Sequence, residues 1–188
     1  MATLACLSPL VAFVLLATPT EAQHQRHDTT VLDLDGAIPL FDNLGSYARR
    51  TTTSNPQAQA FFDQGIRLAC AFGRPEAQQS FVAAIRKDTM CAACRWGLAW
   101  ALGPFVNDSS MHVGAGSIAY EQAQEALRLA PGGSEVERAL IAAVAIRYEP
   151  DPTRHVRAQL DTAYMHAMRD VARRFPDDPN RFDRVHGA

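Results

Sequence analysis

Residues 57–85, QAQAFFDQGIRLACAFGRPEAQQSFVAAI, contain two runs in which apolar side chains recur at every third or fourth position. The two runs are separated by the tripeptide Gly73-Arg74-Pro75. A period of three to four residues is typical of an amphipathic helix, and Gly and Pro commonly mark helix ends. The stretch therefore predicts two helices joined as an antiparallel hairpin, the first starting at Gln57 and the second covering residues 77–85.

A dense cluster of helix-start residues, TTTSNP at 51–56, precedes this hairpin. Ser54 and Gln57 have the spacing of a capping box, in which each side chain bonds the backbone N–H of the other residue. Asn55 fits equally well as the N-cap, with Pro56 in the first helical turn. The residues alone leave both caps open.

Four further helices follow the same period. Pro131 stops one of them and Pro176 stops another, and Ser134 with Glu137 has capping-box spacing. No segment alternates apolar and polar residues as a half-buried strand does. The sequence therefore predicts an all-α fold. The four helices are expected at residues 92–102, at 118–129, from Ser134 to Tyr148, and at 156–175.

The order of small and large residues within the first hairpin is typical of a tetratricopeptide (TPR) repeat. Gly65 is followed by Leu68, Ala77, Phe81 and Ala84, so small residues alternate with bulky ones. Small side chains let two helices approach closely, while large ones fill the gap to the next hairpin. Ala77, Phe81 and Ala84 are separated by four and then three residues. The same two offsets, followed by five residues to a proline, occur twice later in the chain, at Ala119, Ala123, Ala126 and Pro131 and at Tyr164, Met168, Val171 and Pro176.

These offsets predict TPR-like helix-turn-helix repeats, about three hairpins nested in an α-α superhelix. The 34-residue period places Ala99 at the position that Gly65 holds in the first repeat. Eight residues more than the template allows separate Ala99 from Ala119. We therefore expect an expanded Gly- and Ser-rich loop at residues 103–117, at one rim of the groove.

Four stretches carry a likeness to known proteins, namely PLFDNLG at 39–45, AFFDQG at 60–65, WGLAWALGP at 96–104 and ERALI at 137–141. In these stretches the sequence resembles a group of exported bacterial tetratricopeptide proteins, over most of residues 39–179. The resemblance implies a helical repeat fold and no particular activity, because members of the group generally have none assigned. Histidines common in the group are replaced here by SYAR at 46–49 and by Gly73-Arg74, so no metal role carries over.

The N-terminus has the pattern of a cleaved secretory signal peptide. The apolar run from Leu4 to Ala17 is shorter than the roughly 20 residues that a spanning helix needs. Thr20 and Ala22 suit cleavage after Ala22. We therefore expect a periplasmic or secreted protein without membrane insertion after signal removal. The expected organisation is a signal peptide at 1–22, a flexible lead-in at 23–37, a TPR-like domain at 38–179, and a tail at 180–188 that reads as a truncated repeat, since the resembling proteins usually continue.

The charge balance excludes some classes of partner. The chain has 18 Lys and Arg residues against 20 Asp and Glu residues, for a formal net charge of -2. This balance provides no broad basic surface for nucleic acid. We expect the partner to be another protein or a peptide.

Among the motifs in the sequence, Cys91-Ala92-Ala93-Cys94 most strongly suggests a specific chemistry. A Cys-x-x-Cys pair at a helix start can form a disulfide, act as a redox pair or contribute to a metal site. A thioredoxin-like use expects neighbouring strands, and no His or Cys pair at ligand spacing completes a zinc site. A structural disulfide or packed thiols at Cys91 and Cys94 is the favoured interpretation. A small exported redox or metal-binding protein using this pair is the alternative function.

Trp96 and Trp100 lie four residues apart and therefore on one face of the third helix. In tetratricopeptide proteins the first helix of each hairpin lines the groove, so these rings are candidate anchors for a peptide, with core packing as the alternative. No nucleophile elbow, phosphate loop or carboxylate pair stands out, so we expect no enzyme, cofactor or metal. The predicted function is a protein-protein interaction scaffold with a concave groove, whose candidate residues are Phe62, Ile66, Trp96, Trp100 and Arg138.

Overall fold

The computed structural model describes residues 33–105, 111–112, 114–150 and 156–178. Within these ranges the secondary structure is helical, with six α-helices, one short 3-10 helix and no β-strand. The predicted all-α class is therefore confirmed. The helices are α1 (Pro56–Cys70), α2 (Arg74–Lys87), α3 (Ala92–Leu102), α4 (Ala115–Leu129), α5 (Glu135–Ala145) and α6 (Arg157–Arg174), with the 3-10 helix η1 (Ala130–Gly132) between α4 and α5.

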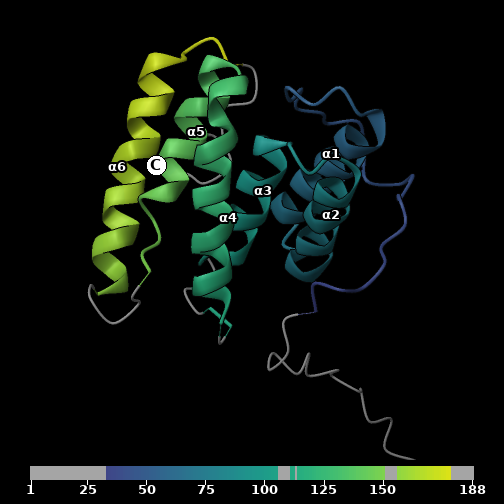
Figure 1. The fold of residues 1–188 in the computed structure, drawn as a ribbon, viewed down its shortest axis with the longest axis horizontal. Helices are drawn as coiled ribbons and strands as arrows, with labels where there is room; N and C mark the ends of the chain where they lie inside the picture. The colour runs from purple at the N-terminus through teal and green to yellow at the C-terminus, as the bar shows by residue number, and fades with distance from the viewer. Residues whose placement is uncertain (1–32, 106–110, 113, 151–155, 179–188) are drawn as a thin grey trace, which may run out of the picture.

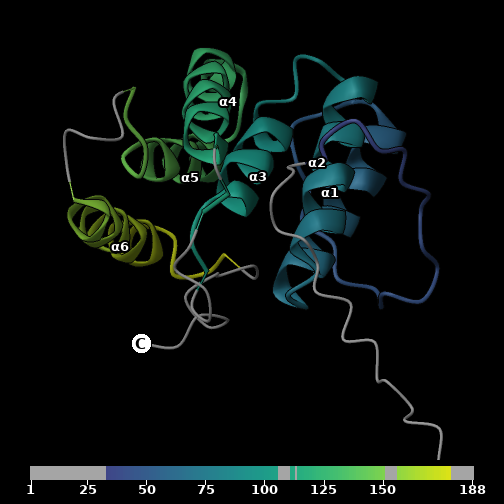
Figure 2. The same ribbon diagram turned by 90° about the horizontal axis from the view of Figure 1, so that it is seen from below.

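Each α-helix packs against the next one in sequence, so the stack follows the order of the helices in the sequence (Figure 1). Helices α1 and α2 lie at one end and α6 lies at the other, as the view from below also shows (Figure 2). Helix α3 contacts α1 and α5 in addition to its two sequence neighbours. The odd-numbered helices α1, α3 and α5 therefore share one face of the stack.

Phe81 of α2 is the packing point of the first three helices. Its ring is fully buried. A Cβ atom built on Gly65 of α1 or on Gly97 of α3 would lie within 3.0 Å of that ring. The absence of a side chain at these two positions therefore lets both helices approach Phe81. Ala77 and Ala84, four residues before and three residues after Phe81, are also fully buried.

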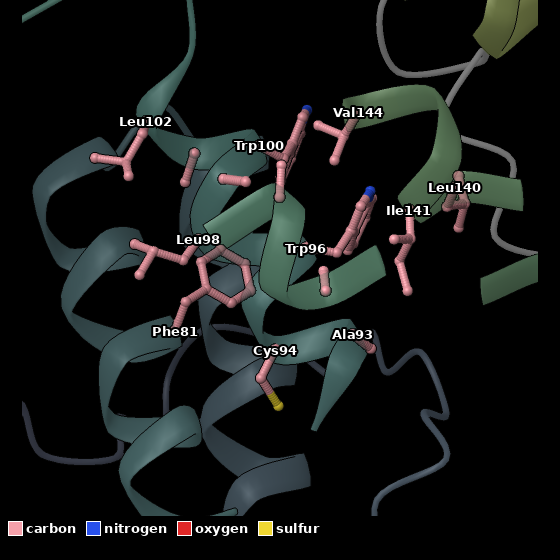
Figure 3. Packing of buried hydrophobic residues seen from close by; sticks show 14 of the residues in the cluster. Phe81, Ala93, Cys94, Trp96, Leu98, Trp100, Leu102, Leu140, Ile141 and Val144 are labelled. Atoms are coloured by element: carbon pink, nitrogen blue, oxygen red, sulfur yellow. The ribbon is translucent and has the colours of Figure 1, made fainter. Parts of the chain in front are cut away.

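A row of aromatic rings extends the core along α3. The ring of Phe62 on α1 lies 6.3 Å from that of Trp96, measured between centroids. Trp96 and Trp100 stack in parallel at 5.9 Å. Both indole rings reach from α3 toward Ile141 and Val144 of α5 (Figure 3). The third helix is thus the centre of the apolar core.

Local capping explains where α1 and α5 begin. Oδ1 of Asn55 accepts the backbone N–H of Gln57 at 2.9 Å and that of Ala58 at 3.2 Å. Of the two caps left open by the sequence, Asn55 is therefore the one used. At α5, Ser134 and Glu137 form the predicted capping box.

Three helix boundaries differ by three residues from the predicted ones. Helix α2 begins at Arg74, inside the predicted break, because Pro75 lies in the first turn, where its missing N–H has no helical partner to lose. Helix α4 begins at Ala115, three residues earlier than predicted. Helix α5 ends at Ala145 and does not extend to Tyr148, because the next residues close tighter turns by i→i−3 hydrogen bonds.

Some predicted segments lie outside the described residues. These are the signal peptide at 1–22, most of the lead-in at 23–37, part of the loop at 103–117 and the tail at 180–188. Among the helices of the described ranges, none is long and apolar enough to span a membrane.

Candidate binding face

A non-helical strap, residues 38–54, precedes α1 and crosses the face shared by the odd-numbered helices. The backbone N–H of Arg49 donates to Oδ1 of Asp63 on α1 at 2.9 Å. The backbone N–H of Thr52 donates to Oε1 of Glu137 on α5 at 2.8 Å, although the two residues are 85 positions apart. The strap therefore connects α1 and α5.

Gln59 of α1 holds the strap by its backbone. Its Oε1 accepts the N–H of Thr51 at 2.9 Å, and its Nε2 donates to the carbonyl oxygen of Arg49 at 2.8 Å. One glutamine amide thus bonds the C=O of one strap residue and the N–H of the residue two positions later. A residue of a neighbouring parallel strand makes the same pair of bonds.

Gln64 of α1 repeats this pattern at the start of the strap. Its Oε1 accepts the N–H of Phe41 at 2.7 Å, and its Nε2 donates to the carbonyl oxygen of Pro39 at 2.9 Å. The two glutamines bond backbone N–H and C=O groups of the strap, and every residue except proline has both groups. These four bonds are therefore independent of the strap's side chains.

Apolar side chains of all three odd-numbered helices form the surface under the strap. Arg49, Arg50 and Thr51 close over this surface and leave a cavity of only about 10 Å³. That volume suits about one water molecule, so the strap fills the space almost completely. The side chains beneath it are Phe62 of α1, Ala93 and Trp96 of α3, and Leu140 and Ile141 of α5.

The structure places four of the five predicted groove residues in the interior. Their exposed fractions are 1% for Phe62, 0% for Ile66, 3% for Trp96 and 5% for Trp100. This burial matches the core-packing alternative, and Phe62 and Trp96 are additionally covered by the strap. Arg138 is exposed, and its Nη1 donates to a backbone carbonyl oxygen in the loop before α5 at 2.6 Å. Arg138 therefore does not line the surface under the strap.

Arg49 joins the strap to the segment that follows α6. Its side chain is 5% exposed, and Nη2 lies 2.9 Å from Oδ2 of Asp178. Burial raises the pKa of the Asp63 carboxyl, and hydrogen bonds from the Arg49 backbone and from Gln59 only partly oppose that rise. Strap closure therefore places ionisable groups in a poorly solvated position.

The residues that hold the strap were not among the predicted site residues. Asp63 and Gln64 are buried beside Phe62 on α1. A polar residue next to apolar residues on the inward side of a predicted helix requires a hydrogen-bond partner. That requirement is the sequence signal that points to them, although it does not identify the partner.

Cys91 and Cys94 form a disulfide at the start of α3, in agreement with the favoured prediction. Cys91 is the N-cap residue, and its Sγ accepts the backbone N–H of Cys94 at 3.1 Å. Among the described cysteines, Cys70 is a free thiol, and burial raises its pKa. The disulfide therefore fixes the first turn of α3.

A second cavity, of about 340 Å³, lies between the strap, the start of α3 and the start of α5. Cys91 lines this cavity, whereas Cys94 does not. Asp88 and Glu137 contribute two carboxyl groups to its wall, and residues 52–54 of the strap contribute three hydroxyls. Its lining contains no Lys, Arg or His. The cavity therefore has a mixed polar and apolar wall, and the charged side chains in its lining are acidic.

The described residues include no group of three or more His, Cys, Asp or Glu side chains that could hold a metal ion. Comparison with known proteins finds no family model, no curated protein and no solved structure that matches the sequence or the fold. The function is therefore inferred from the geometry of the protein's own residues.

Proposed function

We propose that this protein is a non-catalytic interaction scaffold of the tetratricopeptide type, which binds an extended segment of another protein or a peptide. The binding site is the face formed by α1, α3 and α5. The observation that carries the proposal is that this face already binds a non-helical segment, the strap, through backbone hydrogen bonds to side chains of α1 and α5. A partner would take the place of the strap.

The chemistry of the face suits a peptide. Gln59 and Gln64 bond backbone carbonyl and N–H groups, which gives affinity without a demand for one sequence. Phe62 and Trp96 would become exposed when the strap leaves, and aromatic rings are frequent anchors at interfaces. Groups that bond a peptide backbone beside an apolar floor are the combination that peptide grooves use.

The packing of the helices supports the tetratricopeptide part of the proposal. Gly65 and Gly97 lie on the first helices of successive pairs, and both face the ring of Phe81. The residue of α3 that faces this ring with Gly65 is thus Gly97, two positions before the predicted Ala99. Small residues on successive first helices, facing one bulky residue of the helix between them, suit the nesting of hairpins. The three helix pairs would be α1 with α2, α3 with α4, and α5 with α6.

We further propose that the protein functions in the periplasm or outside the cell. This part rests on the apolar run from Leu4 to Ala17 and on the small residues near Ala22. A disulfide between Cys91 and Cys94 is compatible with it, because disulfides persist in oxidising compartments.

A peptide that copies the strap tests the proposed face. The probe is the synthetic nonapeptide SYARRTTTS, residues 46–54, with a fluorescent label at its N-terminus. It is titrated into the full-length protein and into the variant Thr52→Pro, which loses the N–H that Glu137 accepts. The tethered strap competes at an effective concentration in the millimolar range. We therefore expect measurable binding to Thr52→Pro and about ten-fold weaker binding to the parent protein.

Two controls make this test specific. Ser46→Ala changes an exposed strap residue that does not line the covered surface, and it should bind as weakly as the parent. The same nonapeptide, N-methylated at the two amides that correspond to Thr51 and Thr52, keeps its side chains and loses the N–H donors. If folded Thr52→Pro bound neither peptide, or bound both equally, the backbone-binding face would be rejected.

A further inference from the structure

We propose that the Cys91–Cys94 disulfide is a redox-active site, which exchanges with a low-molecular-weight thiol that enters the 340 Å³ cavity beside α3. The preferred thiol is neutral or cationic. This activity is distinct from the scaffold role, because it takes place in a different cavity with the strap in place, although strap residues 52–54 and Glu137 line that cavity.

Access decides which sulfur reacts. Cys91 lines the cavity and is 4% exposed, whereas Cys94 does not line it and is 0% exposed. A volume of 340 Å³ lies within the range of small-molecule pockets. Of the two sulfurs, Sγ of Cys91 is therefore the one assigned to the incoming thiolate, and Sγ of Cys94 is the leaving group.

The position of Cys91 favours its part in the exchange. As the N-cap of α3, its Sγ accepts the N–H of Cys94 at 3.1 Å. A backbone N–H and the positive end of a helix both stabilise negative charge on sulfur. The thiolate that Cys91 carries after reduction is therefore stabilised at the cavity wall, where it can attack the next disulfide.

The exchange balances in two steps. In the first, the thiolate RS⁻ attacks Sγ of Cys91, a bond forms between R–S and Cys91, and the Cys91–Cys94 bond breaks. Its electron pair moves to Sγ of Cys94, which takes a proton from water. In the second, another RS⁻ attacks the R–S sulfur, which gives RSSR and leaves Cys91 as the thiolate. Two thiols are oxidised to one disulfide, and the protein disulfide is reduced by two electrons.

The charge of the cavity wall sets the preference among thiols. Asp88 and Glu137 supply two carboxyl groups to the lining, against one nearby guanidinium, that of Arg138, whose Nη1 lies 2.6 Å from the carbonyl oxygen of the lining residue Gly133. An anionic thiol is repelled at short range, whereas an ammonium group is attracted. The expected selectivity is one of charge, so thiols of similar length and different charge can test it.

Three small thiols of similar size test both claims on the full-length protein. They are cysteamine, which is cationic, 2-mercaptoethanol, which is neutral, and 3-mercaptopropionate, which is anionic. The protein is prepared with Cys6→Ser and Cys70→Ser, so that Cys91 and Cys94 are its only cysteines. Reduction is followed by mass spectrometry after acid quenching and alkylation. Each rate is expressed per thiolate and divided by the rate for the same protein unfolded in urea.

We expect reduction of the folded protein by cysteamine and 2-mercaptoethanol, and a rate for 3-mercaptopropionate that is roughly three- to ten-fold lower than for cysteamine. Asp88→Asn removes one charge and keeps an oxygen that can accept the N–H of Met90, so it should reduce this ratio. If Asp88→Asn does not fold, the ratio of the cysteamine rate to the 3-mercaptopropionate rate in the parent protein still tests the proposal. A disulfide reduced only after unfolding, or equal rates for the cationic and anionic thiols, would overturn the proposal.

Discussion

Gly97 is the residue at which the close packing of α2 against α3 can be tested most directly. Alanine has a higher helix propensity than glycine by about 1 kcal/mol. However, a Cβ atom at position 97 would lie within 3.0 Å of the buried Phe81 ring. Because overpacking a core costs about 1–3 kcal/mol, we expect Gly97→Ala to lower the free energy of unfolding by about 1–2 kcal/mol in urea titrations.

Gly116 is the matched control for this substitution. It lies in the first turn of α4, and the nearest atom to a Cβ built there is the methyl carbon of Met111, at an ordinary 3.8 Å. Gly116→Ala should therefore raise the free energy of unfolding by up to about 1 kcal/mol. Equal effects at positions 97 and 116 would contradict the role assigned to Gly97.

Asp63, which accepts a hydrogen bond from the strap, gives the free energy of unfolding a pH dependence of known sign. Burial raises its pKa above 3.8 in the folded protein. The folded state then binds this proton more tightly than the unfolded state, so ionisation of Asp63 lowers stability as the pH rises through the raised pKa. Asp63→Asn keeps an oxygen that can accept the N–H of Arg49 and does not ionise.

The stability of Asp63→Asn relative to the parent protein is therefore expected to increase between about pH 3 and pH 7. Urea unfolding at a series of pH values measures this difference. Asp170→Asn, at an exposed carboxylate of α6, serves as the control and should show no such increase. A relative stability of Asp63→Asn that falls over this range would contradict a raised pKa at this carboxyl.

At the scale of the elements, the helices were predictable because their signals are local. Capping at Ser134 and Glu137 and the apolar period both lie within a few residues of the helix that they define. The errors are also local, since Pro75 resembles part of a break although it suits a first turn. At the C-terminus of α1 the glycine signal, Gly73, lies one residue beyond the residue in the left-handed conformation, which is Phe72.

Phe72 predicts a stabilising substitution at this helix end. Its φ is 64°, and the N–H groups of Phe72 and Gly73 bond the carbonyl oxygens of Ala69 and Leu68, which is the Schellman pattern. A left-handed conformation costs an L-residue roughly 1–2 kcal/mol, and glycine avoids that cost. Because the Phe72 ring is 57% exposed, little packing is lost. We expect Phe72→Gly to raise the free energy of unfolding by about 1 kcal/mol.

Phe72→Ala separates the two causes of this effect. Alanine removes the exposed ring and keeps the strained conformation, so it should not stabilise the protein as glycine does. Thermal unfolding of the two variants side by side measures the difference. Equal melting temperatures would show that the backbone strain is not relieved.

At the scale of the whole molecule, the fold class was predictable and the state of the candidate binding face was not. The spacing of Trp96 and Trp100 correctly places both rings on one side of α3, but spacing does not say what covers them. The cover over Trp96 is a segment without helical period, held by contacts such as the hydrogen bond from Thr52 to Glu137 over 85 positions. Contacts of this kind depend on the completed tertiary structure, and therefore no local pattern indicates them.

The ion pair between Arg49 and Asp178 joins the strap to the segment after α6, across 129 positions of the sequence. Its side chains are 5% and 16% exposed, so removal of one partner leaves a poorly solvated charge without its counter-ion. We expect Arg49→Gln to lower the free energy of unfolding by about 3 kcal/mol and to speed amide exchange at Thr51 and Thr52. Arg173→Gln, in the exposed pair with Asp170, should change stability by less than about 1 kcal/mol. If the two variants lost equal stability, the strap would be held by its backbone bonds alone, and a partner could displace it without first breaking this ion pair.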